Sequence, residues 1–139
     1  MPTRVLIADP DKYLLTVFQE RLWQEGFEAA TAGDGLQCAA MLEEFSPDVL
    51  VLDPTIAWGG GDGIVAMIHQ DSRVKKVPLI ILLTYGCSPA VLYNISPFPI
   101  ADYLIKPISG NRLAQRIRLA LARRASEAPA SARGEGGAR

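Results

Sequence analysis

The sequence predicts an α/β fold in which a doubly wound, five-stranded parallel sheet carries helices on both faces. Short apolar runs rich in Val, Ile and Leu alternate with longer stretches of helical periodicity, and this alternation is typical of repeated βαβ units. Two runs in the middle of the chain lack polar alternation, which indicates central strands buried on both sides. Four of the runs end in a polar residue suited to chemistry, namely Asp9, Asp53, Thr84 and Lys106.

The strands are assigned from the apolar runs in chain order. The two central runs are entered at Ser46-Pro47 and Val77-Pro78, and a residue that precedes a proline avoids helical backbone. These prolines therefore mark the entries to the two central strands. The predicted strands span residues 4–8, 27–31, 48–53, 78–84 and 101–105.

The helices are assigned from apolar residues that recur at helical spacing. The first helical segment carries Leu14, Leu15, Val17, Phe18 and Leu22 among polar residues, so it should bury a single face. The last segment opposes leucines and isoleucines to several arginines in the same way. The predicted helices span residues 11–25, 34–45, 62–71, 88–95 and 109–124.

Length and composition predict one globular domain over residues 1–124, followed at 125–139 by a disordered tail or linker stub that is too poor in apolar residues to order itself. The net charge of −1 offers no field to attract nucleic acid or an anionic membrane. The apolar stretches fall far short of the roughly 18 residues that cross a bilayer, and the first residues carry no signal-peptide pattern. We therefore expect a cytoplasmic domain without nucleic-acid or membrane partners.

The four polar residues at the strand ends should lie together, because the carboxyl ends of parallel strands meet at one edge of the sheet. An aspartate carboxylate can act as a nucleophile toward a phosphoryl group and form an acyl phosphate. Since a carboxylate and a phosphoryl group repel each other, such a site needs positive charge beside them. Two acids, a hydroxyl and an amine at one edge therefore favour phosphoryl chemistry.

Over residues 4 to about 122 the chain resembles the receiver domain of bacterial two-component response regulators. The resemblance lies in the order of Asp9, Asp53, Thr84 and Lys106, in the run Asp102-Tyr103-Leu104-Ile105-Lys106-Pro107, and in Asp62-Gly63. It implies a sheet in the order 2-1-3-4-5 and a phosphoprotein that accepts a phosphoryl group on Asp53. It also implies a signalling domain rather than a turnover enzyme.

The resemblance assigns further roles at the predicted site. Mg²⁺ would be held by Asp9, Asp53 and the backbone carbonyl of Thr55, which agrees with the preference of Mg²⁺ for one or two carboxylates plus phosphate and water. Lys106 would supply the fixed cation, and Thr84 would hydrogen-bond the phosphoryl oxygens. Tyr103 would change rotamer with Thr84, and Pro107 would be cis and would aim Lys106 into the site.

The same resemblance implies the partners. A histidine kinase or a histidine phosphotransfer protein would donate the phosphoryl group. A downstream protein would read the surface formed by the fourth helix, the fifth strand and the fifth helix, with homodimerisation as one mode of output.

Three features depart from the family pattern. Pro10 stands where the family usually has a second acid, which should weaken Mg²⁺ binding; Asp11 could replace that acid as a metal ligand or could instead cap the first helix. The loop after Asp53 is longer than usual and carries Trp58 on flexible glycines, as a lid, a partner contact or a tolerated insertion. Tyr85 follows Thr84 where the family has a small residue, and its ring should narrow access.

Two alternatives remain open from the sequence. A degenerate receiver would bind proteins without being phosphorylated, and Pro10 and Tyr85 favour it whereas Asp53, Thr84 and Lys106 do not. A haloacid-dehalogenase-like phosphatase would use Asp9 as its nucleophile, because Asp9-Pro10-Asp11 resembles its Asp-x-Asp motif. Such enzymes need an acidic pair beyond the lysine, and no aspartate follows Lys106.

Overall fold

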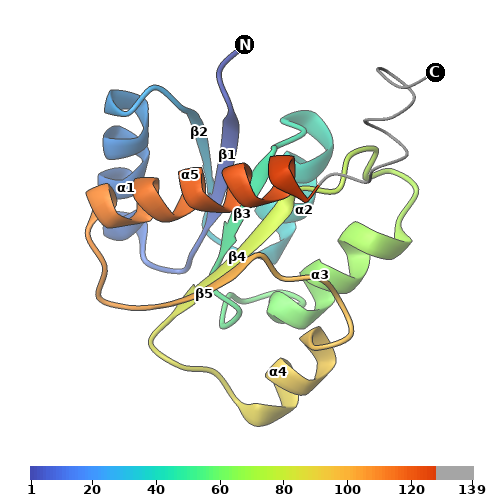
Figure 1. The fold of residues 1–139 in the computed structure, drawn as a ribbon. Coiled ribbons are helices and arrows are strands. Elements are labelled where there is room, and N and C mark those ends of the chain that lie inside the picture. Colours follow the sequence, from blue (N-terminus) through green and yellow to red (C-terminus); the bar gives the residue numbers. More distant parts are fainter. Residues whose placement is uncertain (128–139) are drawn as a thin grey trace, which may run out of the picture.

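A computed structural model describes residues 1–127 and shows five strands that alternate with five helices over this range. The strands form one parallel sheet in the order β2-β1-β3-β4-β5 (Figure 1). The fold class and strand order predicted from the sequence are therefore confirmed. The elements are β1 (Arg4–Ala8), α1 (Lys12–Gln24), β2 (Glu28–Ala32), α2 (Gly35–Glu44), β3 (Val49–Leu52), α3 (Gly60–Gln70), β4 (Leu79–Thr84), α4 (Pro89–Ile95), β5 (Asp102–Ile105) and α5 (Gly110–Ser126).

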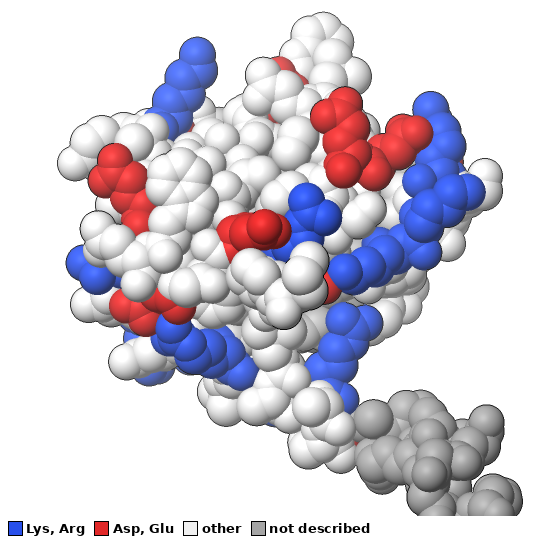
Figure 2. Space-filling model, turned by 90° about the horizontal axis from the view of Figure 1, so that it is seen from above, with Lys and Arg blue, Asp and Glu red and all other residues white. Residues whose placement is uncertain are grey.

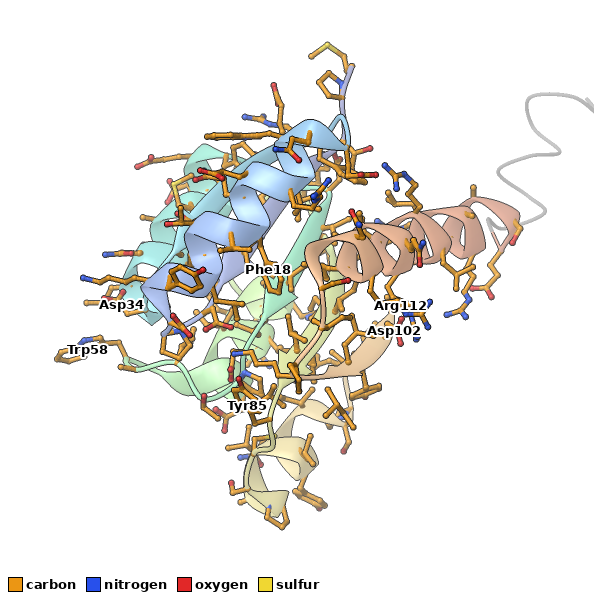
Figure 3. The ribbon with its side chains drawn as sticks, turned by 90° about the vertical axis from the view of Figure 1, so that its left-hand side faces the viewer. Phe18, Asp34, Trp58, Tyr85, Asp102 and Arg112 are labelled. Carbon is orange, nitrogen blue, oxygen red and sulfur yellow. The ribbon has the colours of Figure 1, made fainter. Side chains whose placement is uncertain are left out.

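Helices cover both faces of the sheet, and each face has its own hydrophobic core. Helices α1 and α5 lie on one face, and α2, α3 and α4 lie on the other (Figure 1). The central strand β3 serves both cores, since its valines join the α1/α5 core and its leucines join the other. Phe18 points from α1 onto the sheet (Figure 3) and is fully buried there. This two-sided burial explains why the central runs show no polar alternation.

The register of the sheet fixes the positions of the residues that follow the strands. Leu52 in β3 pairs with Ala8 in β1 and with Leu82 in β4, so the next residues along β1 and β3 emerge at the same level. The backbone N–H of Asp53 donates to Ala8 O at 2.9 Å. On the other side, the Lys106 N–H donates to Thr84 O at 3.0 Å, which continues the β4–β5 ladder by one residue.

The element boundaries agree with prediction to within one residue except at two helices. Helix α3 begins at Gly60 rather than at residue 62, because Gly59 adopts a left-handed φ of 91° as its N-cap and the Gly61 N–H donates to Pro54 O at 2.9 Å. Helix α5 continues to Ser126, past the predicted domain end at 124. The rest of the predicted tail, residues 128–139, lies outside the described residues.

Charged side chains of both signs are interspersed on the face shown in Figure 2. This mixture agrees with the net charge of −1. Within residues 1–127, no helix combines the length and apolar character needed to span a membrane.

Candidate functional site

One ammonium group and two carboxylates meet at the edge of the sheet where the strands have their carboxyl ends. The Lys106 ammonium lies 2.7 Å from Asp9 Oδ2 and 2.8 Å from Asp53 Oδ2, so it bridges the two acids. All three side chains are buried, with exposed fractions of 2% for Asp9, 3% for Asp53 and 7% for Lys106. Charges this deeply buried persist only when they are paired and hydrogen-bonded, and here each acid has the lysine as its partner.

The remaining carboxylate oxygens are held by the loops that follow the strands. Asp53 Oδ1 accepts hydrogen bonds from the Thr55 hydroxyl at 2.7 Å and from the Thr55 backbone N–H at 2.9 Å. Asp9 Oδ1 accepts from the Asp11 backbone N–H at 2.9 Å. Each carboxylate is therefore fixed in orientation from both sides.

The electrostatic environment shifts the pKa values of the two aspartates in opposite directions. Burial raises the pKa of Asp9, and its hydrogen bonds to Lys106 and the Asp11 N–H offset this only in part. Burial also acts to raise the pKa of Asp53, but the bonds from Lys106 and Thr55 outweigh it and hold the pKa below its usual value. The pKa of Lys106 is raised because its bonds to both acids outweigh its burial. Asp53 is thus held as the ionised carboxylate that a nucleophile must be.

The structure gives Asp11 the role of a helix cap. Its Oδ1 accepts from the backbone N–H groups of Tyr13 at 3.0 Å and Leu14 at 3.2 Å at the start of α1, which is a common role for aspartate at this position. Of the two roles that the sequence left open for Asp11, the capping role is confirmed. The metal role receives no support from this geometry.

The donor set at this edge fits Mg²⁺. Asp9 and Asp53 place two carboxylates on the same lysine, and Mg²⁺ typically takes one or two carboxylates together with water and phosphate oxygens. Pro10 contributes no side-chain oxygen, and no cluster of three or more His, Cys, Asp or Glu ligands occurs within residues 1–127. Asp9 and Asp53 are the carboxylates that this edge offers to a metal.

The other predicted residues lie around this centre. The Thr84 hydroxyl closes a turn, because it accepts from the Gly86 N–H at 3.1 Å and donates to Gly86 O at 3.2 Å. Tyr103 lies on the edge strand β5 with 58% of its surface exposed. The Lys106–Pro107 peptide bond is cis, as the resemblance implied.

One side-chain interaction at the site was not predicted from the sequence. The Thr55 hydroxyl donates to Asp53 Oδ1, whereas the resemblance implied a role for the Thr55 carbonyl alone. An aspartate two residues before a backbone N–H is a recognisable signal for the Thr55 N–H bond, but it does not predict the hydroxyl bond.

The loop that carries Trp58 is anchored to α2, since the Gly35 N–H donates to Ala57 O at 2.8 Å and a Cβ on Gly35 would lie 1.8 Å from Trp58 O. Trp58 itself has a φ of 65° and points away from the body of the molecule (Figure 3).

Comparisons with known proteins agree on one family. The family model described as the response regulator receiver domain matches residues 5–118. The DNA-binding response regulator MtrA of Mycobacterium tuberculosis is 30% identical over 127 residues, which cover 91% of this chain and 54% of that protein. The probable transcriptional regulator ycf27 of Guillardia theta is 32% identical over 122 residues, which cover 86% of this chain and 46% of that protein. The chain thus spans about half the length of these relatives.

Solved structures share the fold. A CheY-like response regulator receiver domain from Methanospirillum hungatei has a TM-score of 0.78 at 20% identity and covers 91% of this chain and 99% of its own. The signal receiver domain of an HD domain-containing protein from Pseudomonas fluorescens has a TM-score of 0.78 at 24% identity, with 91% and 100% covered. At these identities the likeness shows the fold alone.

Proposed function

This chain belongs to the response regulator receiver domain family of two-component systems, and we propose that Asp53 is the residue that accepts its phosphoryl group. One observation carries this proposal. Asp53 is a buried carboxylate at the sheet edge, and a lysine 2.8 Å away ties it to a second carboxylate, Asp9. Nucleophile, counter-charge and metal-binding oxygens therefore occupy one small volume.

The transfer step follows from this arrangement. An Asp53 oxygen attacks the phosphorus of a phosphohistidine or a small acyl phosphate, a P–O bond forms to Asp53, and the bond from phosphorus to the donor breaks with its electron pair leaving on the donor. Lys106 neutralises charge on the phosphoryl oxygens from a fixed position. Mg²⁺ held by Asp9, Asp53 and the Thr55 carbonyl would supply further charge neutralisation.

An oxygen of Asp53 can attack while its hydrogen bonds rearrange, because each carboxylate oxygen has two lone pairs. Both of its oxygens are engaged, Oδ2 by Lys106 and Oδ1 by Thr55. Lys106 can pass from the carboxylate to the incoming phosphoryl oxygens without losing an anionic partner. We propose that this exchange commits the site to transfer.

We propose that the phosphorylated state is read on the surface formed by α4, β5 and α5. Thr84 leaves its turn with Gly86 to bond the phosphoryl oxygens, and Tyr103 changes rotamer in response. Tyr103 and Ile105 already expose 58% and 76% of their surfaces on β5, which suits contact with a protein partner or a second copy of the chain. The donor would be a histidine kinase or a histidine phosphotransfer protein in a bacterial cytoplasm.

The relatives are named as DNA-binding or transcriptional regulators, and this chain corresponds to about half of their length. We propose that the described fold is the phosphoacceptor domain and makes no contact with nucleic acid. The arginines of α5 support this in part, because Arg116 is paired with Asp102 at 2.7 Å and Arg118 with Glu25 at 2.8 Å.

Intact mass after incubation with Mg²⁺ and acetyl phosphate tests the proposal. Wild type and Asp9→Asn are compared with Asp53→Asn, and Asp11→Asn serves as a control because it alters a carboxylate that caps α1. We expect a single phosphoryl adduct on wild type and on Asp11→Asn, and none on Asp53→Asn. Absence of any adduct would favour the degenerate receiver, whereas an adduct that survives Asp53→Asn and is lost in Asp9→Asn would favour the phosphatase.

A further inference from the structure

We propose that a cavity at the amino end of β4 binds a small organic anion with a flat apolar body. The cavity has a volume of about 670 Å³. It is formed where the C-terminal end of α5, red in Figure 1, lies beside the start of β4 and the residues that lead into β5. Its size is typical of sites for small molecules, which measure about 300–1,000 Å³.

This cavity is separate from the Asp53 site. Leu79 lines the cavity and begins β4, whereas Thr84 ends β4 at the opposite edge of the sheet. Because a strand rises by about 3.3 Å per residue, the two ends of β4 lie about 16 Å apart. A ligand in the cavity therefore leaves the phosphoacceptor site open, and the proposal goes beyond the proposed function.

The walls of the cavity are mostly apolar. They are formed from β4, from the segment before β5 and from α5, by Val77, Pro78, Ile80, Pro99, Ile100 and Ala120 among others. The His69 ring adds a flat wall that is held on two sides, because its Nδ1 donates to Val65 O at 3.0 Å and the ring stacks on Phe98 with centroids 4.9 Å apart. Such walls suit the flat apolar body of a ligand.

Two arginines bring positive charge to the same cavity. Arg123 and Arg124 lie exposed in the last turn of α5 and line the cavity. Within residues 1–127 neither guanidinium has a carboxylate within 4.0 Å, whereas every other arginine of this range except Arg112 has one. Glu127 also lines the cavity, but its carboxylate pairs with neither arginine. The two guanidinium groups are thus left to bind an acidic group of a ligand.

The helix dipole gives these arginines a second role without replacing the first. Cations in the last turn of a helix are stabilising, which accounts for Arg123 and Arg124 but not for the apolar cavity beside them. The planar fork of a guanidinium matches the oxygens of a carboxylate or a phosphate. An organic anion uses both features, since its acidic group meets the arginines while its apolar body fills the cavity.

Fluorescence titration of the full chain with 8-anilinonaphthalene-1-sulfonate tests the proposal, because this probe joins aromatic rings to one tetrahedral oxyanion. N-phenyl-1-naphthylamine is the matched neutral probe, with the same rings and no sulfonate. Amide NMR shifts locate each probe on the molecule. We expect one saturable site per chain for the sulfonate probe, with shifts centred on Val77, Ile80 and Ile100.

The double variant Arg123→Gln/Arg124→Gln should weaken the sulfonate probe about tenfold, because each exposed ion pair contributes a few-fold in affinity. The neutral probe should bind this variant as it binds wild type, which also shows that the fold is intact. The control is Arg112→Gln/Lys75→Gln, which removes the same net charge from exposed residues outside the cavity. It should bind both probes as wild type does.

Equal weakening of the sulfonate probe in both double variants would overturn the role of the two arginines. Binding of both probes that the arginine substitutions leave unaltered would make the ligand apolar and overturn its charge. Shifts confined to Tyr103 and Ile105 would place the probe on the exposed side chains of β5 and overturn the site, as would absence of saturable binding to wild type. None of these outcomes depends on the phosphoryl adduct, which is measured separately.

Discussion

Replacement of Lys106 by Met should destabilise the fold strongly and in a pH-dependent manner. The substitution removes the positive charge and leaves two buried carboxylates facing each other. The two Oδ2 atoms lie 2.7 and 2.8 Å from the same nitrogen, so they are at most about 5.5 Å apart. At an effective dielectric constant of about 20, two negative charges at that distance repel by about 3 kcal/mol.

Removing one partner of a buried ion pair typically costs about 3–5 kcal/mol, and we expect a loss in this range at pH 7. Without Lys106 the pKa of one carboxylate rises further, so the folded state binds a proton more tightly than the unfolded state. Stability must then increase as pH falls. About 2 kcal/mol of the loss should be recovered at pH 5.

Urea unfolding of wild type, Lys106→Met and Lys75→Met at pH 7 and pH 5 measures both effects. Lys75 is exposed, so Lys75→Met should stay within about 0.5 kcal/mol of wild type. If Lys106→Met is unfolded at pH 7, adding Asp9→Asn should restore folding, because only one buried carboxylate then remains. A loss under about 1 kcal/mol, or an equal loss at both pH values, would refute the electrostatic reasoning.

Three further predictions concern the packing of two glycines and the hydrogen bonds of two aspartates. Gly35→Ala should lower the free energy of unfolding by about 1–3 kcal/mol in thermal or urea unfolding, because the added Cβ would collide with the backbone of the β3–α3 loop. In Gly63→Ala the added Cβ meets nothing within 4 Å, so this substitution should stabilise α3 by roughly 1 kcal/mol. Asp48→Asn should make the free energy of unfolding depend less on pH between pH 5 and pH 3. Burial acts to raise the pKa of Asp48, but its bonds to Lys76 and the Arg4 N–H outweigh burial and lower the pKa. The stability that Asp48 contributes is therefore present above the ordinary pKa of aspartate and is lost as pH falls. Thr55→Val should raise the pKa of Asp53 in a carboxyl NMR titration and cost about 1 kcal/mol at pH 7, and an unchanged titration would exclude the hydroxyl bond.

The strands, the shared level of Asp9 and Asp53, and the cap of α1 were predictable from the sequence. The apolar runs fixed the strands because a run without polar alternation must be buried on both faces, and the register then forced Asp9 and Asp53 to the same level. Capping of α1 by Asp11 was also predictable, since an aspartate before a helical run has few better roles.

Other features depended on three-dimensional packing. The hydroxyl bond from Thr55 depends on the rotamer of an exposed side chain, which no spacing rule specifies. The position of the Tyr85 ring over Lys106 depends on the path of the β4–α4 loop. The early start of α3 depends on the close packing of Gly61 on Pro54, where a Cβ would lie 2.4 Å from Pro54 Cα.

The location of the phosphoryl group tests the central claim most directly. Wild-type chain loaded with acetyl phosphate and Mg²⁺ would be reduced with borohydride, which converts an aspartyl phosphate into homoserine, and then mapped by peptide mass spectrometry. The account predicts homoserine at position 53 and unmodified aspartate at positions 9 and 11. Homoserine at position 9, or none in a chain whose fold is intact, would contradict it.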